Sequence, residues 1–103
     1  MIPYRKLFIV IAGFLLFTSA QAAEVSKHAR GLAASCSACH GTDGKSEGGM
    51  PELAGLDRML FITSMKEFKS GARPATVMHQ HAKGYTDEEF ALLADFFAAQ
   101  KRH

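Results

Sequence analysis

The residues best suited to chemistry are two cysteines and a histidine within a short run, Cys36-Ser-Ala-Cys39-His40. Two cysteines at this spacing occur in disulfides, in thioredoxin-like redox sites and in zinc sites. The histidine that directly follows the second cysteine adds another possibility. In the C-x-x-C-H pattern, both thiols form thioether bonds with a haem and the histidine ligates the haem iron.

The rest of the sequence helps to choose among these kinds of site. A thioredoxin-like site needs strands that alternate with helices, and no segment has the pattern of a strand. A zinc site needs two further ligands, for which His79 and His81 are available, but zinc does not explain why His40 adjoins Cys39. A disulfide would close a loop too short to stabilise much of the chain. The pattern therefore favours one covalent haem c, with thioethers at Cys36 and Cys39 and with His40 on the iron.

The N-terminal residues have the order of a secretory signal peptide. Arg5 and Lys6 precede an apolar run over residues 7–17, and small residues follow up to Ala23. A membrane span needs roughly 20 apolar residues, and this run is shorter. We therefore predict that residues 1–22 are a cleaved signal peptide, that residues 23–103 form the folded domain, and that the mature protein is periplasmic.

The charge balance and the length narrow the classes of function. The 103 residues include 12 Lys and Arg and 10 Asp and Glu, and loss of Arg5 and Lys6 with the signal leaves 10 of each. A balanced mature chain gives no indication of nucleic-acid binding. About 80 mature residues are few for a hydrophobic core, and domains of this size commonly depend on a tightly held group. A haem would be such a group.

Apolar periodicity and breaker residues predict an all-α fold. A first helix is expected over residues 24–39 and runs into the cysteine motif. A second helix is expected over residues 56–71. Residues 41–51 and 74–85 are rich in loop-forming residues, and we predict that both segments are loops.

Capping residues mark where the later helices begin and end. Asp57 is a plausible N-cap of the second helix and Gly71 lies just past its end. Thr86 and Glu89 form a capping box at the start of the last helix. The side chains expected to face the core are Met59, Leu60, Ile62, Met65 and Phe68 in the second helix, and Phe90, Leu93, Phe96 and Phe97 in the last.

A second axial ligand for the iron must come from another methionine or histidine. The candidates are His28, Met50, Met59, Met65, Met78, His79 and His81. Met59 and Met65 fall on the apolar face of a helix, where methionine usually fills a core. Met50 follows the motif closely, in a loop expected on the His40 side. Met78 lies in the loop before the last helix, which can cross the other haem face, and its histidine neighbours remain rivals.

The mature chain resembles the monohaem class I bacterial cytochromes c. The resemblance rests on the segments LAASCSACHGTDG, MPELAGL, MKEFKSGARPATVM and AKGYTDEEFALLADFFAAQ. It implies a cytochrome c domain over residues 23–103, in which helices and loops surround one haem and the first and last helices cross. It also places the second axial ligand at Met78. Pro51 matches a proline whose carbonyl accepts a hydrogen bond from the haem-ligating histidine.

The segment RPATVM…AKGYTDEE is similar to the cytochrome subunit of flavocytochrome c sulfide dehydrogenases. That similarity implies a haem with His40 and Met78 as axial ligands, which accepts electrons from an FAD-containing, sulfide-oxidising flavoprotein subunit and passes them to other redox proteins. No catalytic residue is expected, because two filled axial positions suit electron transfer. Arg73 either pairs with a haem propionate or is simply solvated.

Two other functions remain open from the sequence. One is a freely diffusing cytochrome c that carries electrons to a terminal oxidase or a reductase. The other is an enzyme or gas sensor with an open position on the haem iron. Neither nucleic acid nor, once the signal peptide is removed, a membrane is expected as a partner.

Overall fold

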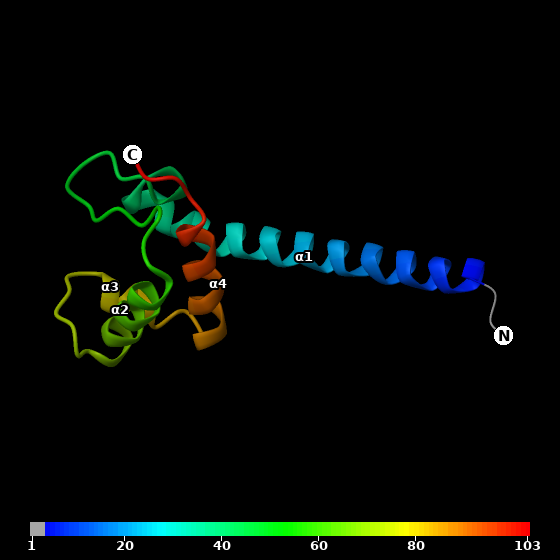
Figure 1. Cartoon of the computed structure of the whole chain (residues 1–103). Helices are drawn as coiled ribbons and strands as arrows, with labels where there is room; N and C mark the ends of the chain where they lie inside the picture. Colours follow the sequence, from blue (N-terminus) through cyan, green and yellow to red (C-terminus); the bar gives the residue numbers. More distant parts are fainter. Residues whose placement is uncertain (1–3) are drawn as a thin grey trace.

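The computed structural model describes the backbone of residues 4–103 and the side-chain surroundings of residues 20–103. The elements are the α-helix α1 (Tyr4–His40), the 3₁₀-helix η1 (Thr42–Gly44), and the α-helices α2 (Arg58–Ser70), α3 (Met78–Ala82) and α4 (Asp87–Ala98). No strand occurs in this described part, and the predicted all-α fold is confirmed. Figure 1 shows α1 as a long rod whose last turns join a body made by the other elements.

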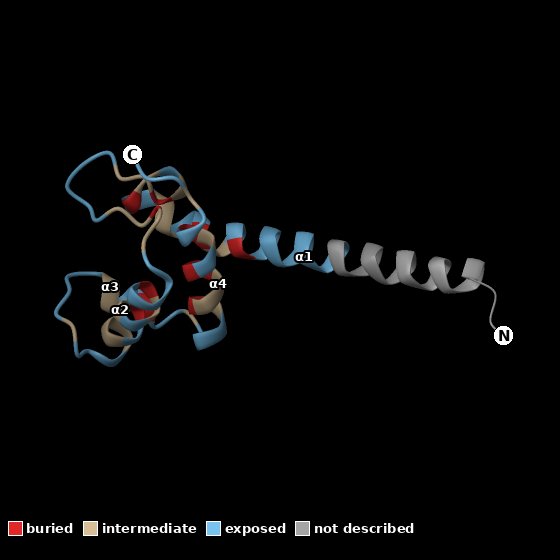
Figure 2. Ribbon diagram, in the orientation of Figure 1, coloured by how far each residue is buried: buried red, intermediate tan, exposed pale blue. Residues whose placement is uncertain are grey.

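The helix α1 packs on the body only near its C-terminal end. Residues 20–28 are exposed, and Ala29 is the first side chain of the described part that is buried (Figure 2). The predicted cleavage point after residue 22 falls within this helix, and the first three residues of the predicted signal peptide lie outside the described residues. In the part of the chain that the structure describes, no helix combines the length and the apolar character of a membrane span. The signal peptide and the domain over residues 23–103 stay predictions.

The helices α1 and α4 cross at the point where α1 enters the body (Figure 1). Ala33 of α1 and Ala94 of α4 belong to the same buried cluster. At the edge of the crossing, the guanidinium of Arg30 lies 5.5 Å from the ring centre of Phe96. Small side chains at a crossing let two helices approach closely. The crossing thereby sets the position of the cysteine motif relative to the core.

The core is centred on α4. Phe90, Leu93 and Phe97 have 0% of their surface exposed, as the periodicity predicted, and Phe96 is half-buried. The ring of Phe97 lies 5.8 Å from that of Phe61 in α2 and 5.2 Å from that of Phe96. Aromatic pairs at such separations stabilise a core beyond the area that they bury. This cluster joins α2 to α4.

The buried face of α2 differs from the prediction. Met59 and Leu60 were expected in the core but are 59% and 49% exposed, whereas Phe61 and Met65 are buried. The prediction was wrong for Met59 and Leu60 because Phe61, Met65 and Phe68 are the residues that pack against the core cluster. A helix turns by about 100° per residue, so Met59 lies on the opposite side from Phe61.

The caps of α2 and α4 lie where the sequence predicted them. The Asp57 carboxylate accepts a hydrogen bond from the Leu60 amide at 3.0 Å, and Gly71 ends α2 in the left-handed conformation. At α4, the Thr86 hydroxyl accepts from the Glu89 amide at 3.1 Å and the Glu89 carboxylate accepts from the Thr86 amide at 2.9 Å. This is a complete capping box.

We expect Thr86→Ala to lower the free energy of unfolding by about 1 kcal/mol, because the Glu89 amide at the start of α4 loses its side-chain acceptor. Chemical denaturation measures the difference. Thr63→Ala is the matched control, since Thr63 is exposed in the middle of α2, and its effect should stay within about 0.5 kcal/mol. Equal losses in the two variants would show that the cap contributes nothing specific.

The segment between α1 and α2 is held against the core by backbone hydrogen bonds. The Leu53 amide donates to the Gly44 carbonyl at 2.9 Å, and the Gly55 amide donates to the Phe97 carbonyl at 2.8 Å. Gly44 has a φ of 77°, and a Cβ at this position would lie 2.8 Å from the side chains of both Leu53 and Phe97. Only glycine adopts this positive φ without strain, and only glycine lacks the Cβ that would clash with these two side chains. These contacts fix the loop that carries Pro51.

The predicted loop over residues 74–85 contains the short helix α3. Residues 75–83 include neither glycine nor proline, so the chain can form a helical turn there. Ala82 is fully buried and belongs to the core cluster, and α3 packs against α2. One turn is too short to show an apolar period, which explains why the sequence did not reveal it.

Candidate functional site

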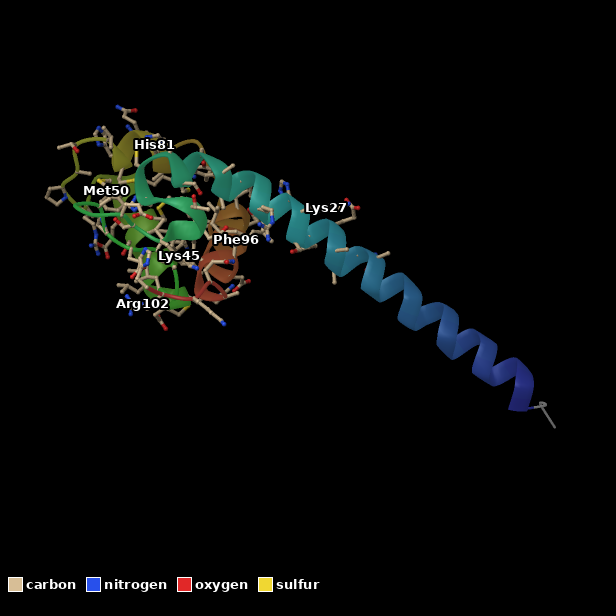
Figure 3. The ribbon with its side chains drawn as sticks, turned by 90° about the horizontal axis from the view of Figure 1, so that it is seen from above. Lys27, Lys45, Met50, His81, Phe96 and Arg102 are labelled. Carbon is tan, nitrogen blue, oxygen red and sulfur yellow. The ribbon has the colours of Figure 1, made fainter. Side chains whose placement is uncertain are left out.

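A cavity of about 230 Å³ lies between the last turn of α1, the loop before α2, and the helices α2 and α3. Most of its wall is apolar. All five residues that the sequence singled out line this cavity, namely Cys36, Cys39, His40, Pro51 and Met78. They come from three segments of the chain that only the fold brings together. Figure 3 shows Met50 and His81, which also line it, on the side of the body away from the projecting part of α1.

The two cysteines lie on the last turn of α1. Both are free thiols, with Cys36 half-buried and Cys39 exposed. Residues three apart on a helix share a face, so both sulfurs are directed to one wall of the cavity. Burial raises the pKa of the Cys36 thiol, and its hydrogen bond with the Ser35 side chain opposes this in part. An uncharged thioether therefore suits this wall better than a thiolate does.

His40 is the last residue of α1 and is only 7% exposed. Its Nδ1 lies 2.7 Å from the carbonyl oxygen of Pro51. A carbonyl can only accept, so Nδ1 carries the proton and Nε2 keeps its lone pair. This tautomer is the one that a metal ligand needs, and the carbonyl holds the plane of the ring. The hydrogen bond that the resemblance implied for Pro51 is thus present.

The structure separates the candidates for the second axial position. The ones that line the cavity are Met50, Met65, Met78 and His81, and the ones that do not are His28, Met59 and His79. Met65 is 5% exposed within the core face of α2. Met78, the first residue of α3, is half-buried on the wall, whereas His81 is exposed. Of the two α3 residues that line the cavity, Met78 is thus the more buried.

Sequence reasoning missed a contact at the edge of this cavity. The hydroxyl of Tyr85 lies 2.6 Å from the hydroxyl of Ser35, and both residues line the cavity. Ser35 also donates to the Leu32 carbonyl at 3.3 Å, so it accepts from Tyr85. The pair ties the cysteine turn of α1 to the segment before α4. No local pattern links two residues 50 positions apart.

The donor set fits a haem and does not suit zinc. Apolar walls, two sulfurs on one helix turn and an imidazole with an available Nε2 are what a covalently held haem requires. Within residues 20–103, no group of three or more His, Cys, Asp and Glu side chains gathers into a metal site. The zinc alternative therefore lacks a ligand set in this range.

Comparisons with known proteins show the family of this chain. The family model described as Cytochrome c matches residues 26–101. The chain is 45% identical over 74 residues to the "Cytochrome subunit of sulfide dehydrogenase" of Chlorobaculum tepidum, a match that covers 70% of this chain and 67% of that protein.

Two other relatives are longer than this chain. The "Thiosulfate dehydrogenase electron acceptor" of Stutzerimonas stutzeri is 36% identical over 91 residues, which cover 82% of this chain and 42% of that protein. "Cytochrome c4" of Pseudomonas aeruginosa is 37% identical over 70 residues, which cover 67% of this chain and 35% of that protein. The chain thus spans less than half the length of these two relatives. It belongs to the cytochrome c family, as a class I monohaem cytochrome c that transfers electrons through one covalently bound haem c.

Proposed function

We propose that Cys36 and Cys39 hold the haem through thioether bonds and that His40 and Met78 are its two axial ligands. The observation that supports this best is the cavity, whose wall carries both sulfurs, the buried imidazole and the Met78 side chain. Such a haem exchanges single electrons between its ferric and ferrous states. With both axial positions filled, oxygen and peroxide have no open site on the iron.

The residues around the ligands keep them in place. His40 is oriented by the Pro51 carbonyl at 2.7 Å, and the loop that carries Pro51 is bonded to the core. Met78 begins α3, which is anchored because Ala82 is fully buried. Ligands on a rigid frame move little when the charge of the iron changes. That property favours fast electron transfer over bond-making.

We further propose that the mature protein works in the periplasm and accepts electrons from an FAD-containing, sulfide-oxidising flavoprotein subunit. Similarity to a protein named the cytochrome subunit of sulfide dehydrogenase supports this partner. The rim of the cavity supports it as well. Met50 and Val77 come from different segments of that rim and are 37% and 48% exposed, as is usual for apolar residues that a partner covers.

A co-purification experiment with matched methionine variants tests this partner. An affinity-tagged chain expressed in its native host should retain an FAD-containing protein under mild conditions. Met50→Glu should weaken that association by about tenfold or more, because it places a charge in an apolar contact. Met59→Glu is the control, since Met59 is 59% exposed but does not line the cavity. A lone monomer from the wild-type chain, or equal retention by both variants, would contradict the proposal.

A freely diffusing carrier is the second candidate. The similarity to a protein named the thiosulfate dehydrogenase electron acceptor favours it. Such a carrier forms small and short-lived contacts, and its association with partners weakens steeply with salt when it is electrostatic. Purification of the chain by itself, with unchanged haem spectra, would support this candidate over a permanent subunit.

A further inference from the structure

A second, open hollow lies directly behind one wall of the haem cavity. Phe68 and Arg73 line both hollows, so they form the wall between them. The second hollow carries Lys69, Arg73, His79 and Lys83, and these four residues are called the basic recess below. No aspartate or glutamate is among the described residues that line it. The recess therefore favours negatively charged groups.

Arg73 is held at this wall while most of its hydrogen-bonding capacity stays available. Its Nε donates to a carboxylate oxygen of Glu67 at 3.1 Å, and its guanidinium lies 5.5 Å from the ring centre of Phe68. The contact with Glu67 uses one of the five N–H donors of a guanidinium. The side chain is 41% exposed, so a further carboxylate can reach it.

The structure of haem indicates which carboxylate would reach Arg73. The vinyl groups that form thioethers lie on one edge of the ring, and the two propionate carboxylates lie on the opposite edge. A haem held by the two cysteines would have its vinyl edge at the last turn of α1, which would leave its carboxylates on the side away from that turn. Besides the last turn of α1 and the loop before α2, the cavity is lined by residues of α2, of α3 and of the segment between them, which includes Arg73.

An unpaired carboxylate in an apolar cavity is costly, so a propionate needs a cation there. Among the described residues that line the haem cavity, Arg73 is the only lysine or arginine. A guanidinium binds a carboxylate through two parallel hydrogen bonds, which a lysine cannot do. Lys69 is already committed, since its Nζ donates to the Tyr85 carbonyl at 2.5 Å.

We propose that Arg73 binds a haem propionate, that Glu67 holds the guanidinium in position, and that the basic recess behind them adds to the positive potential. Arg73 is thus a cofactor-binding residue and Glu67 is a positioning residue. A positive charge at this place favours the ferrous state, because reduction lowers the charge of the iron by one.

The reduction potential of the purified holoprotein tests the proposal. Arg73→Gln should lower the potential, and at a fixed electrode potential the ferrous-to-ferric ratio should fall by about twofold to thirtyfold. This range follows from Coulomb's law if two unit charges are taken to be about 8 Å apart, with an effective dielectric constant between about 80 and about 20. The far-red band of sulfur-ligated ferric haem should persist, which shows that Met78 is unaffected.

The matched control is Arg58→Gln. Arg58 forms a similar ion pair, with Asp95 at 2.6 Å, and its side chain is 46% exposed, but it does not line the haem cavity. The reduction potential of the Arg58→Gln variant should differ from that of the wild type much less than the potential of Arg73→Gln does. Arg73→Lys should recover part of the loss. Glu67→Gln keeps a carbonyl that can accept from the Nε of Arg73 and removes only the negative charge, so it should raise the potential.

Two results would overturn the proposal. One is an Arg73→Gln potential equal to that of the wild type, and the other is an equal fall in the Arg58→Gln control. If Arg73→Gln does not accumulate as holoprotein, Lys83→Gln provides the measurement, since Lys83 is exposed on the rim of the recess. Its potential should fall by a smaller amount, and an unchanged potential there would also contradict the proposal.

Discussion

Replacing Met78 with alanine is expected to lower the reduction potential of the holoprotein by on the order of 100 mV, because axial ligands set haem potentials over a range of about 0.8 V. A thioether raises the potential, so its loss acts in the downward direction. The far-red band of sulfur-ligated ferric haem should disappear as well. The open axial position should then bind carbon monoxide in the reduced protein at neutral pH, which the wild-type protein should not do.

Met50→Ala is the matched control for this experiment. Met50 also lines the cavity, so the Met50→Ala variant removes the same kind of side chain from a different segment of its wall. It should leave the far-red band in place and should not admit carbon monoxide. If the band survives Met78→Ala and disappears in Met50→Ala, the axial assignment is wrong. If wild-type protein binds carbon monoxide readily, the haem has an open site and the electron-transfer reading of the ligands fails.

Replacing Phe97 with alanine is expected to lower the free energy of unfolding by about 3–5 kcal/mol. Phe97 is fully buried, and its ring contacts those of Phe61 and Phe96. Its carbonyl also accepts from the Gly55 amide, which ties the loop before α2 to α4. Because marginally stable domains unfold with about 5–15 kcal/mol, this single change removes a large part of the total. Chemical denaturation of the holoprotein measures it.

Met59→Ala is the control for Phe97→Ala, because it removes an apolar side chain that is exposed and not buried. Met59 was expected in the core from its apolar character, but it is 59% exposed on α2. Its replacement should change the free energy of unfolding by no more than about 0.5 kcal/mol. A loss as large as that of Phe97→Ala would mean that α2 is rotated relative to the structure described above.

The parts that the sequence determined by itself are those in which the physics is local. Cys36, Cys39 and His40 lie close together along one helix, so their spacing alone indicates a motif for haem attachment. The caps at Asp57 and Thr86 were predictable for the same reason, since an N-cap bonds to an amide only three residues away. The apolar stripe of α4 followed from helical periodicity.

The tertiary structure alone decided which residues face which partner. An apolar pattern shows that α2 has a buried side, but the neighbouring α4 and the cavity determine that Phe61 is buried while Met59 and Leu60 are exposed. The short helix α3 forms because Ala82 packs into the core, which no single turn can show in a sequence.

In the site, too, some features follow from local sequence spacing and others depend on the tertiary structure. The cysteine motif could be recognised from local spacing, whereas the sequence left seven candidates for the second axial ligand, and four of these line the cavity. Likewise, the Tyr85 to Ser35 contact and the position of Arg73 between two hollows join residues that are far apart along the chain. Local spacing specifies contacts within a helical turn, but contacts between distant segments depend on how the helices pack, and packing is a property of the whole fold.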